Sequence, residues 1–165
     1  MESTSPAEKQ QTMAAYRTEL ASDHLAAADL KAGRALFKNK CAQCHKLYGE
    51  GASIGPDLTG SQRTSLDYLL QHVVDPGAVV PNEYKVYTLL TNDGRLVQGV
   101  VPEQNDKVVV IQTPTERIVI DRTDIDEFTP ASLSMMPEGL LESLTPAERR
   151  DLVGYLSTPS APGRQ

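Results

Sequence analysis

Both cysteines of this chain and one of its three histidines lie within five consecutive residues, Cys41-Ala42-Gln43-Cys44-His45. Two thiols at this spacing can add to the two vinyl groups of one haem, and the adjacent imidazole is then held beneath the iron. The pentapeptide therefore predicts one covalently attached haem c, with Cys41 and Cys44 as the attachment points and His45 as the proximal iron ligand.

Three other interpretations fit the pentapeptide less well. A structural zinc site usually takes four Cys or His ligands, but the sequence has no second cysteine pair, and His24 and His72 stand alone. A thioredoxin-like redox pair lies where a strand runs into a helix, near a βαβ pattern. Here residues 30–40 have helical spacing, and no βαβ unit follows. A structural disulfide is possible, but it gives no reason for His45.

The composition argues against some classes of partner. The 165 residues carry a formal charge of −6 without a cluster of Lys or Arg, which argues against nucleic acid and anionic membrane surfaces. No window is long and apolar enough to span a bilayer. Aromatic residues are scarce, with no Trp, two Phe and six Tyr. A large apolar cofactor would supply the packing surface that these side chains lack.

Haem attachment of this type takes place outside the cytoplasm in bacteria, so an export signal is expected. The first six residues have neither a basic region nor an apolar one. We therefore expect a mature form, or a domain cut from a longer exported protein, in the periplasm or otherwise outside the cytoplasm.

Helical spacing dominates both ends of the chain. We expect helices over 6–27, over 30–40 with Asp29 as the cap, and over 66–74, opened by Thr64 with Asp67. The third helix stops at Asp75-Pro76-Gly77. The last helix begins at a capping box with proline at its first position, Thr145-Pro146-Ala147-Glu148.

The middle of the chain has the period of a strand. Residues 84–90 alternate and are followed by a strong hairpin turn, Asn92-Asp93-Gly94. Further strands are expected over 96–101, 107–112 and 116–121, and the carboxylates at 121, 124, 126 and 127 are interpreted as a solvated face. We therefore predict a mainly α fold with an inserted antiparallel sheet of four or five strands. The expected organisation is a helical extension over 1–28, a main domain over 29–157 with the β insert at 84–128, and a flexible tail over 158–165.

The sixth iron ligand decides the function, because a thioether raises the reduction potential and suits electron transfer, whereas an open position suits ligand binding. Met135 and Met136 lie in a non-periodic stretch just before Pro137. We expect Met136 to be the distal ligand because its proline neighbour stiffens the backbone, with Met135 as the alternative. Both methionines could instead only pad the haem face. Other candidates are His72 and, more remotely, His24, Met13 and lysine side chains.

Together these motifs resemble class I c-type cytochromes over residues 30–75 and 132–157. Gly33 and Phe37, with Leu152 and Tyr155, resemble the family's contact between first and last helices, which implies that Phe37 and Tyr155 cover the haem edge. The run Gly55-Pro56-Asp57-Leu58 resembles the loop beneath the proximal histidine. That resemblance implies that the Pro56 carbonyl accepts the other ring N–H of His45. Met136-Pro137 resembles the distal methionine loop.

A closer resemblance is to the haem-binding domain at the C-terminus of large exported planctomycete proteins, often found beside dehydrogenase-like domains. It rests on residues 75–84, on the strand with Asn92-Asp93-Gly94-Arg95, and on residues 132–140, and that family carries the same β insert. The family usually has Ser-Leu-Met-Pro, whereas this chain has the longer Ser-Leu-Ser-Met-Met-Pro, so either methionine, or neither, could reach the iron. The helix over 6–27 lies outside the resemblance.

The function that these observations predict is that of a monohaem c-type cytochrome, not itself an enzyme, which carries single electrons outside the cytoplasm. Its expected partner is a redox protein or a fused dehydrogenase domain. One alternative is a haem-based gas-binding or sensing domain with a labile distal methionine. Another is a structural interaction module that the haem holds together.

Overall fold

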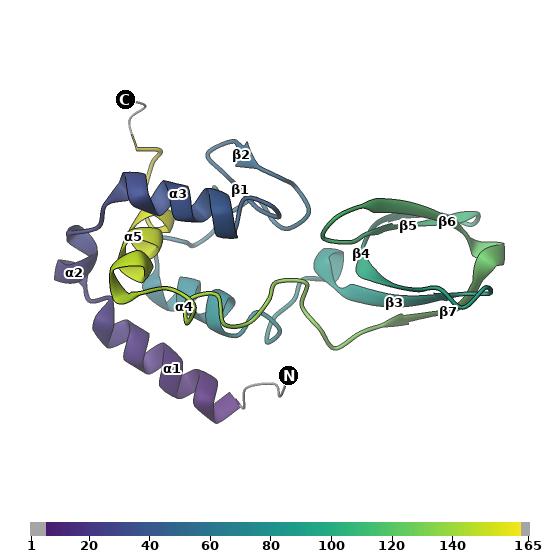
Figure 1. The fold of residues 1–165 in the computed structure, drawn as a ribbon, viewed down its shortest axis with the longest axis horizontal. Coiled ribbons are helices and arrows are strands. Elements are labelled where there is room, and N and C mark those ends of the chain that lie inside the picture. The colour runs from purple at the N-terminus through teal and green to yellow at the C-terminus, as the bar shows by residue number, and fades with distance from the viewer. Residues whose placement is uncertain (1–5, 163–165) are drawn as a thin grey trace. The chain divides into compact units, whose positions relative to one another are not determined.

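The computed structural model describes residues 6–162 and divides into two units. The helical unit comprises Met1–Pro76 and Glu138–Gln165, and the β unit is Gly77–Pro137, the segment between them. The elements of the helical unit are α1 (Pro6–Glu19), α2 (Ser22–Ala26), α3 (Leu30–Lys40), β1 (Lys46–Leu47), β2 (Glu50–Gly51), α4 (Leu66–Val74) and α5 (Pro146–Leu156) (Figure 1). Those of the β unit are η1 (Asn82–Tyr84), β3 (Val86–Thr91), β4 (Leu96–Gln104), β5 (Val108–Gln112), β6 (Arg117–Asp121), η2 (Arg122–Asp124) and β7 (Ile125–Pro130).

At the starts of α3, α4 and α5, a side chain accepts hydrogen bonds from the backbone N–H groups of the first helical turn. The Asp29 carboxylate accepts from the N–H groups of Lys31 and Ala32, each at 3.0 Å, and so starts α3. Thr145 and Glu148 form the predicted capping box of α5. The cap of α4 is Ser65, whose hydroxyl accepts from the N–H of Tyr68, and not Thr64 as expected.

The single helix predicted over 6–27 is wrong, because α1 ends at Glu19 and α2 begins at Ser22. Ala21 has extended backbone angles (φ −55°, ψ 155°), and Leu20 beside it is fully buried. The break lets the chain turn toward α5, where Gly154 lies so close to Ala28 that a Cβ on Gly154 would be 2.4 Å from the Ala28 Cβ. Tertiary packing therefore overrides a helical periodicity that continues through the turn.

The core of the helical unit forms where α3 and α5 pack together. A Cβ on Gly33 would lie 2.1 Å from the backbone oxygen of Asp151 and 2.7 Å from the Tyr155 Cβ, so only glycine permits this approach. The surrounding buried core consists of Met13, Tyr16, Leu20, Phe37, Leu47, Leu69, Leu70, Leu141, Leu144, Leu152, Val153, Tyr155 and Leu156.

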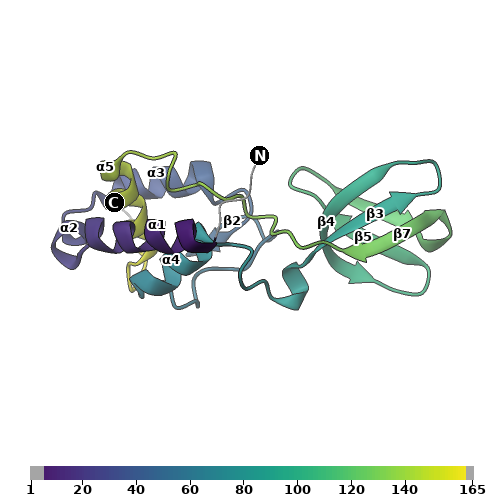
Figure 2. The same ribbon diagram turned by 90° about the horizontal axis from the view of Figure 1, so that it is seen from below.

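The N-terminal helix α1 belongs to this core. Its apolar residues Met13 and Tyr16 are buried, and the helix packs beside α4 (Figure 2). Its last residue, Glu19, pairs with Arg149 of α5 through two hydrogen bonds, Nε to Oε2 at 2.7 Å and Nη2 to Oε1 at 2.8 Å. The Arg149 guanidinium also lies 4.9 Å from the centroid of the Tyr16 ring. The extension is therefore an integral layer of the helical unit.

The β unit is an antiparallel sheet with the strand order β6-β5-β4-β3-β7. Its strands curl around a small core of their own, formed by Leu89, Val97, Val109, Ile111 and Ile120 (Figure 1). The hairpin predicted at Asn92-Asp93-Gly94 is confirmed and joins β3 to β4, with Gly94 in the left-handed region.

The prediction of a mainly α fold is wrong. The described residues contain a five-stranded and a two-stranded antiparallel sheet beside the helices, so the chain is a mixed α and β protein. Strand β7 pairs with β3 and carries Asp126 and Glu127, two of the carboxylates that had been interpreted only as a solvated face. These two residues are exposed, as expected. The sequence did not reveal the strand, because its pairing partner β3 lies far away along the chain.

Within residues 6–162, no helix combines the length and the apolar character needed to cross a membrane. The expected tail over 158–165 begins with Thr158, whose carbonyl accepts a hydrogen bond from the Tyr48 hydroxyl at 2.7 Å. Residues 163–165 lie outside the described part of the chain.

The Glu19–Arg149 pair predicts a measurable acid sensitivity. The hydrogen bonds from Arg149 lower the pKa of Glu19, so the pair stabilises the fold above the unfolded-state pKa of about 4.3 and is lost as pH falls through the lower folded-state pKa. We expect Glu19→Gln to lower the free energy of unfolding by about 1–3 kcal/mol at pH 7 and by much less at pH 3.

Urea unfolding at the two pH values measures this difference. Asp67→Asn is the matched control, because it removes the exposed Arg17–Asp67 pair, which also starts from α1. An equal loss for both variants at pH 7, or a Glu19→Gln effect that does not depend on pH, would contradict the prediction.

Candidate functional site

The pentapeptide Cys41–His45 continues directly from the end of α3. The N–H of Cys41 donates to the Phe37 carbonyl at 2.8 Å, and the N–H groups of Cys44 and His45 both donate to the Cys41 carbonyl, at 3.1 and 2.9 Å. These bonds wind residues 41–45 into a tight turn with a fixed spacing between the two thiols and the imidazole. The helix therefore sets the position of the site, and the turn sets its internal geometry.

The orientation of His45 is fixed through one of its ring nitrogens. Its Nδ1 lies 2.8 Å from the backbone oxygen of Pro56. Because a carbonyl oxygen only accepts hydrogen bonds, Nδ1 carries the hydrogen, and the lone pair is left on Nε2. This is the tautomer that ligates a metal through Nε2, and the hydrogen bond increases the basicity of the ligand.

Gly55 leaves the space in which the His45 ring lies, and the sequence alone did not identify this role. A Cβ on Gly55 would lie 2.8 Å from His45 Cε1 and 3.0 Å from His45 Nδ1. The N–H of Gly55 also donates to the Cys44 carbonyl at 2.7 Å, so backbone groups of both Gly55 and Pro56 bond to the pentapeptide. In the sequence Gly55 was noted only as a loop glycine and as the first residue of the run Gly55-Pro56-Asp57-Leu58, with no role of its own.

The two aromatic residues expected at the haem edge lie together. Phe37 is fully buried and Tyr155 nearly so, and their ring centroids are 5.9 Å apart. The ring of Tyr48 meets Tyr155 edge-on at 6.2 Å. These aromatic rings join α3, the loop after the pentapeptide and α5, and so give the site a rigid base.

Arg63 is a second support that the sequence did not reveal. It is buried, and it donates to the carbonyls of Thr59, Leu156 and Thr158. Its guanidinium also lies 4.9 Å from the centroid of the Tyr48 ring. Arg63 thus fastens the loop below His45 to the end of α5. A single arginine in a loop belongs to no sequence pattern from which this role could be predicted.

The thiols suit covalent attachment to a haem. Cys41 and Cys44 are not joined in a disulfide, and both are partly exposed. Burial raises the pKa of the Cys41 thiol to about 11, and it also raises the pKa of Cys44. Without the cofactor both side chains are therefore neutral thiols near pH 7. Two free thiols, an imidazole with Nε2 available and a glycine beside the ring form a donor set that fits haem c.

The other predicted ligands belong to other parts of the chain. Met135 and Met136 belong to the β unit, just before the chain re-enters the helical unit at Glu138, and the Met136 N–H donates to Ser134 Oγ at 3.2 Å. His72 Nδ1 bonds to the Tyr68 carbonyl at 2.8 Å within α4. Ligation of the iron by Met136 or Met135 stays a prediction.

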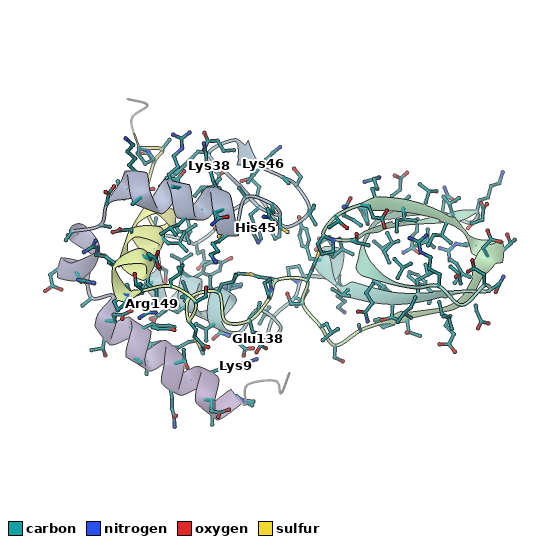
Figure 3. The ribbon with its side chains drawn as sticks, viewed as in Figure 1. Lys9, Lys38, His45, Lys46, Glu138 and Arg149 are labelled. Carbon is teal, nitrogen blue, oxygen red and sulfur yellow. The ribbon has the colours of Figure 1, made fainter. Side chains whose placement is uncertain are left out.

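The zinc interpretation finds no support among residues 6–162, where no three Cys, His, Asp or Glu side chains are grouped to hold a metal ion. His24 lies on α2, and its backbone N–H bonds to the side chain of Asp23. In Figure 3 His45 is drawn near the end of α3, with Lys38 and Lys46 on the neighbouring surface of the helical unit.

Comparison with known proteins adds independent findings. A family model described as cytochrome c matches residues 30–89. Cytochrome c of Guizotia abyssinica is 33% identical over 78 residues, which cover 44% of this chain and 70% of that protein. Cytochrome c of Sesamum indicum is 33% identical over 76 residues, covering 43% and 68%. Cytochrome c of Cochliobolus lunatus is 61% identical over 33 residues, covering only 19% and 31%.

The close approach of Gly55 to His45 predicts that a methyl group there will disturb the imidazole. Gly55→Ala should displace the ring from the Pro56 carbonyl and lower the free energy of unfolding of the haem-loaded protein by about 1–3 kcal/mol. Absorption spectra of the haem and urea unfolding measure both effects.

Gly60→Ala is the matched control in the same loop. A Cβ on Gly60 meets no heavy atom within 4 Å, and Gly60 is outside the left-handed region. If the two variants have the same spectra and the same stability, the close approach of Gly55 to His45 is not needed to orient the imidazole.

Proposed function

The chain belongs to the cytochrome c family, and from this premise we propose that it carries single electrons through one haem held by Cys41, Cys44 and His45. Membership of the family implies a covalently attached haem c and electron transfer. The observation that carries the assignment of roles is the 2.8 Å contact between His45 Nδ1 and the Pro56 carbonyl. It leaves Nε2 available on an imidazole that cannot rotate freely, as a permanent iron ligand requires.

The chain's own residues would hold this centre and tune it. Bound haem supplies an iron that exchanges one electron between its ferric and ferrous states. Cys41 and Cys44 would hold the haem through thioether bonds, and His45 would ligate the iron through Nε2. Pro56 and Gly55 hold the imidazole in one orientation, and Arg63 holds the loop that carries them. These contacts would keep the imidazole in one orientation during electron transfer.

We propose Met136 as the distal ligand, with Met135 as the alternative. A thioether in the sixth position raises the reduction potential and closes the iron to outside ligands, which suits an electron carrier. Pro137 restricts the backbone beside Met136, which favours a stable arrangement of that side chain. Phe37 and Tyr155 would cover the haem edge from the α3–α5 contact.

We further propose that this electron carrier works outside the cytoplasm, as a domain of a larger exported protein of the planctomycete type. The partner would be a redox protein or a fused dehydrogenase domain that supplies electrons from its own substrate. The chain itself would not be an enzyme. The motifs at residues 75–84 and 132–140 support this finer assignment.

One observation favours a second candidate function. The segment with both methionines belongs by its contacts to the β unit, whereas His45 belongs to the helical unit. A distal ligand supplied by a separate unit can dissociate more readily than one from the same core. The second candidate is therefore a haem-based gas-binding or sensing domain with a labile methionine.

Optical spectra of the haem-loaded protein separate the two functions. We expect a methionine–iron charge-transfer band in the ferric form and only weak binding of carbon monoxide to the ferrous form, because the thioether competes for the sixth position. Met136→Ala should abolish the band, lower the reduction potential and open the iron to carbon monoxide.

Met135→Ala is the matched control, since it removes a thioether of the same size from the neighbouring position. Loss of the band in that variant alone would assign the ligand to Met135. Ready binding of carbon monoxide to the unmodified protein would instead favour the gas-binding function.

A further inference from the structure

A buried lysine joins two parts of the helical unit that lie far apart in the sequence. Lys9 of α1 is only 9% exposed, yet its Nζ lies 2.8 Å from Asp75 Oδ1 and 2.6 Å from Glu138 Oε1. Figure 3 shows Lys9 and Glu138 next to each other. Hydrogen bonds to Asp75 and then to Glu138 raise the pKa of Lys9, so the ammonium group stays charged. A lysine is buried at such a place only when it is paired, because an unpaired ammonium there is costly.

Along the sequence, one of the two carboxylates precedes the β unit and the other follows it. Asp75 is the C-terminal cap of α4 and lies one residue before the helical unit stops at Pro76. Glu138 is the first residue of the helical unit after the chain returns. Lys9 therefore binds the point at which the chain leaves the helical unit and the point at which it comes back. None of these three residues belongs to the pentapeptide or to its loop.

Beyond Glu138 the chain is held firmly. Leu141 and Leu144 are buried in the core, and Nη1 of Arg149 donates to their carbonyls at 3.1 and 2.6 Å. Before Glu138, the N–H of Met136 bonds within its own segment, to Ser134. Among the described residues that follow the methionines, Glu138 is the first whose side chain forms an ion pair within the helical unit.

Connectivity alone keeps Met136 close to this point. Successive Cα atoms are about 3.8 Å apart, so the Met136 Cα stays within about 7.6 Å of the Glu138 Cα. Whatever fixes Glu138 therefore limits where the thioether of Met136 can go. This limit does not depend on how the two units are placed.

We propose that Lys9 is a positioning residue for the distal methionine, which it holds in reach of the iron by binding Glu138 and Asp75. The inference rests on the proposed function, in which Met136 or Met135 is the sixth ligand. Loss of the Lys9–Glu138 bond frees the methionine segment and increases the fraction of time in which the sixth position is open.

A purely structural role is the alternative, because Lys9 also ties α1 to the end of α4. The chain offers a matched control for that role. Arg17 of α1 bonds to Asp67 of α4 at 2.6 Å, so it joins the same two helices without touching the methionine segment. Arg17→Leu and Lys9→Leu both remove a cation from α1, but only Lys9→Leu releases Glu138.

The experiment uses the haem-loaded full chain, with the charge-transfer band in the ferric form and carbon monoxide titration of the ferrous form. Lys9→Leu and Glu138→Gln should each weaken the band and raise the apparent affinity for carbon monoxide by about tenfold. Because both variants break the Lys9–Glu138 bond, the double variant should show no larger effect than Lys9→Leu alone. Lys9→Arg should restore the band, and Arg17→Leu should leave the affinity within about twofold of the unmodified protein.

The results separate this inference from the proposed function. An intact band with unchanged carbon monoxide affinity in Lys9→Leu and Glu138→Gln would overturn the role of Lys9 and leave methionine ligation standing. Absence of the band in the unmodified protein would overturn methionine ligation and the positioning role together. If Lys9→Leu does not fold, Glu138→Gln, which keeps the Lys9–Asp75 pair, decides the question alone.

Discussion

The constraint on which the helical unit depends is that the His45 imidazole must keep a single orientation. Its own turn cannot do this, because the bonds of residues 41–45 fix the backbone and leave the ring free to rotate. The 2.8 Å hydrogen bond to Pro56 and the open space at Gly55 together select one rotamer and one tautomer. The loop with these two residues must in turn be held in place, and this is the role of Arg63, which binds carbonyls at the end of α5.

Long-range polar contacts close the helical unit around its apolar core. Arg149 joins α1 to α5, and Arg63 joins the proximal loop to α5. Lys9 joins α1 to Asp75 and Glu138, which lie next to the points where the chain leaves and re-enters the helical unit. The apolar residues beneath supply most of the stability but few directional constraints. Directional contacts from charged groups then fix how α1, the proximal loop and the returning chain lie on that core. This explains why all three cations are largely buried.

The parts of the fold that the sequence predicted are those with local signals. Asp29 and the Thr145–Glu148 box mark helix starts through bonds that span only three residues, and Asn92-Asp93-Gly94 marks a turn in the same way. The pentapeptide is local as well. What the sequence did not predict depends on distant partners. Residues 125–130 form the strand β7 because they pair with β3. The helix is interrupted after Glu19, where Leu20 is buried in the core. Gly55 was marked only as part of the run Gly55-Pro56-Asp57-Leu58, and Lys9 had no sequence signal, since the roles of both residues are contacts and not patterns.

The two faces of the iron would therefore be held by different kinds of interaction. The proximal face is defined by covalent and backbone bonds within residues 41–56, a stretch inside the region that matches the family model. The distal ligand, if it is Met136, comes from outside that region, and so does Lys9 on α1. An interaction of moderate strength, such as one ion pair, can be weakened without loss of the cofactor, whereas a thioether bond cannot. The family resemblance thus covers the residues that attach the haem, whereas the proposed closure of the sixth position would depend on residues outside the matched region.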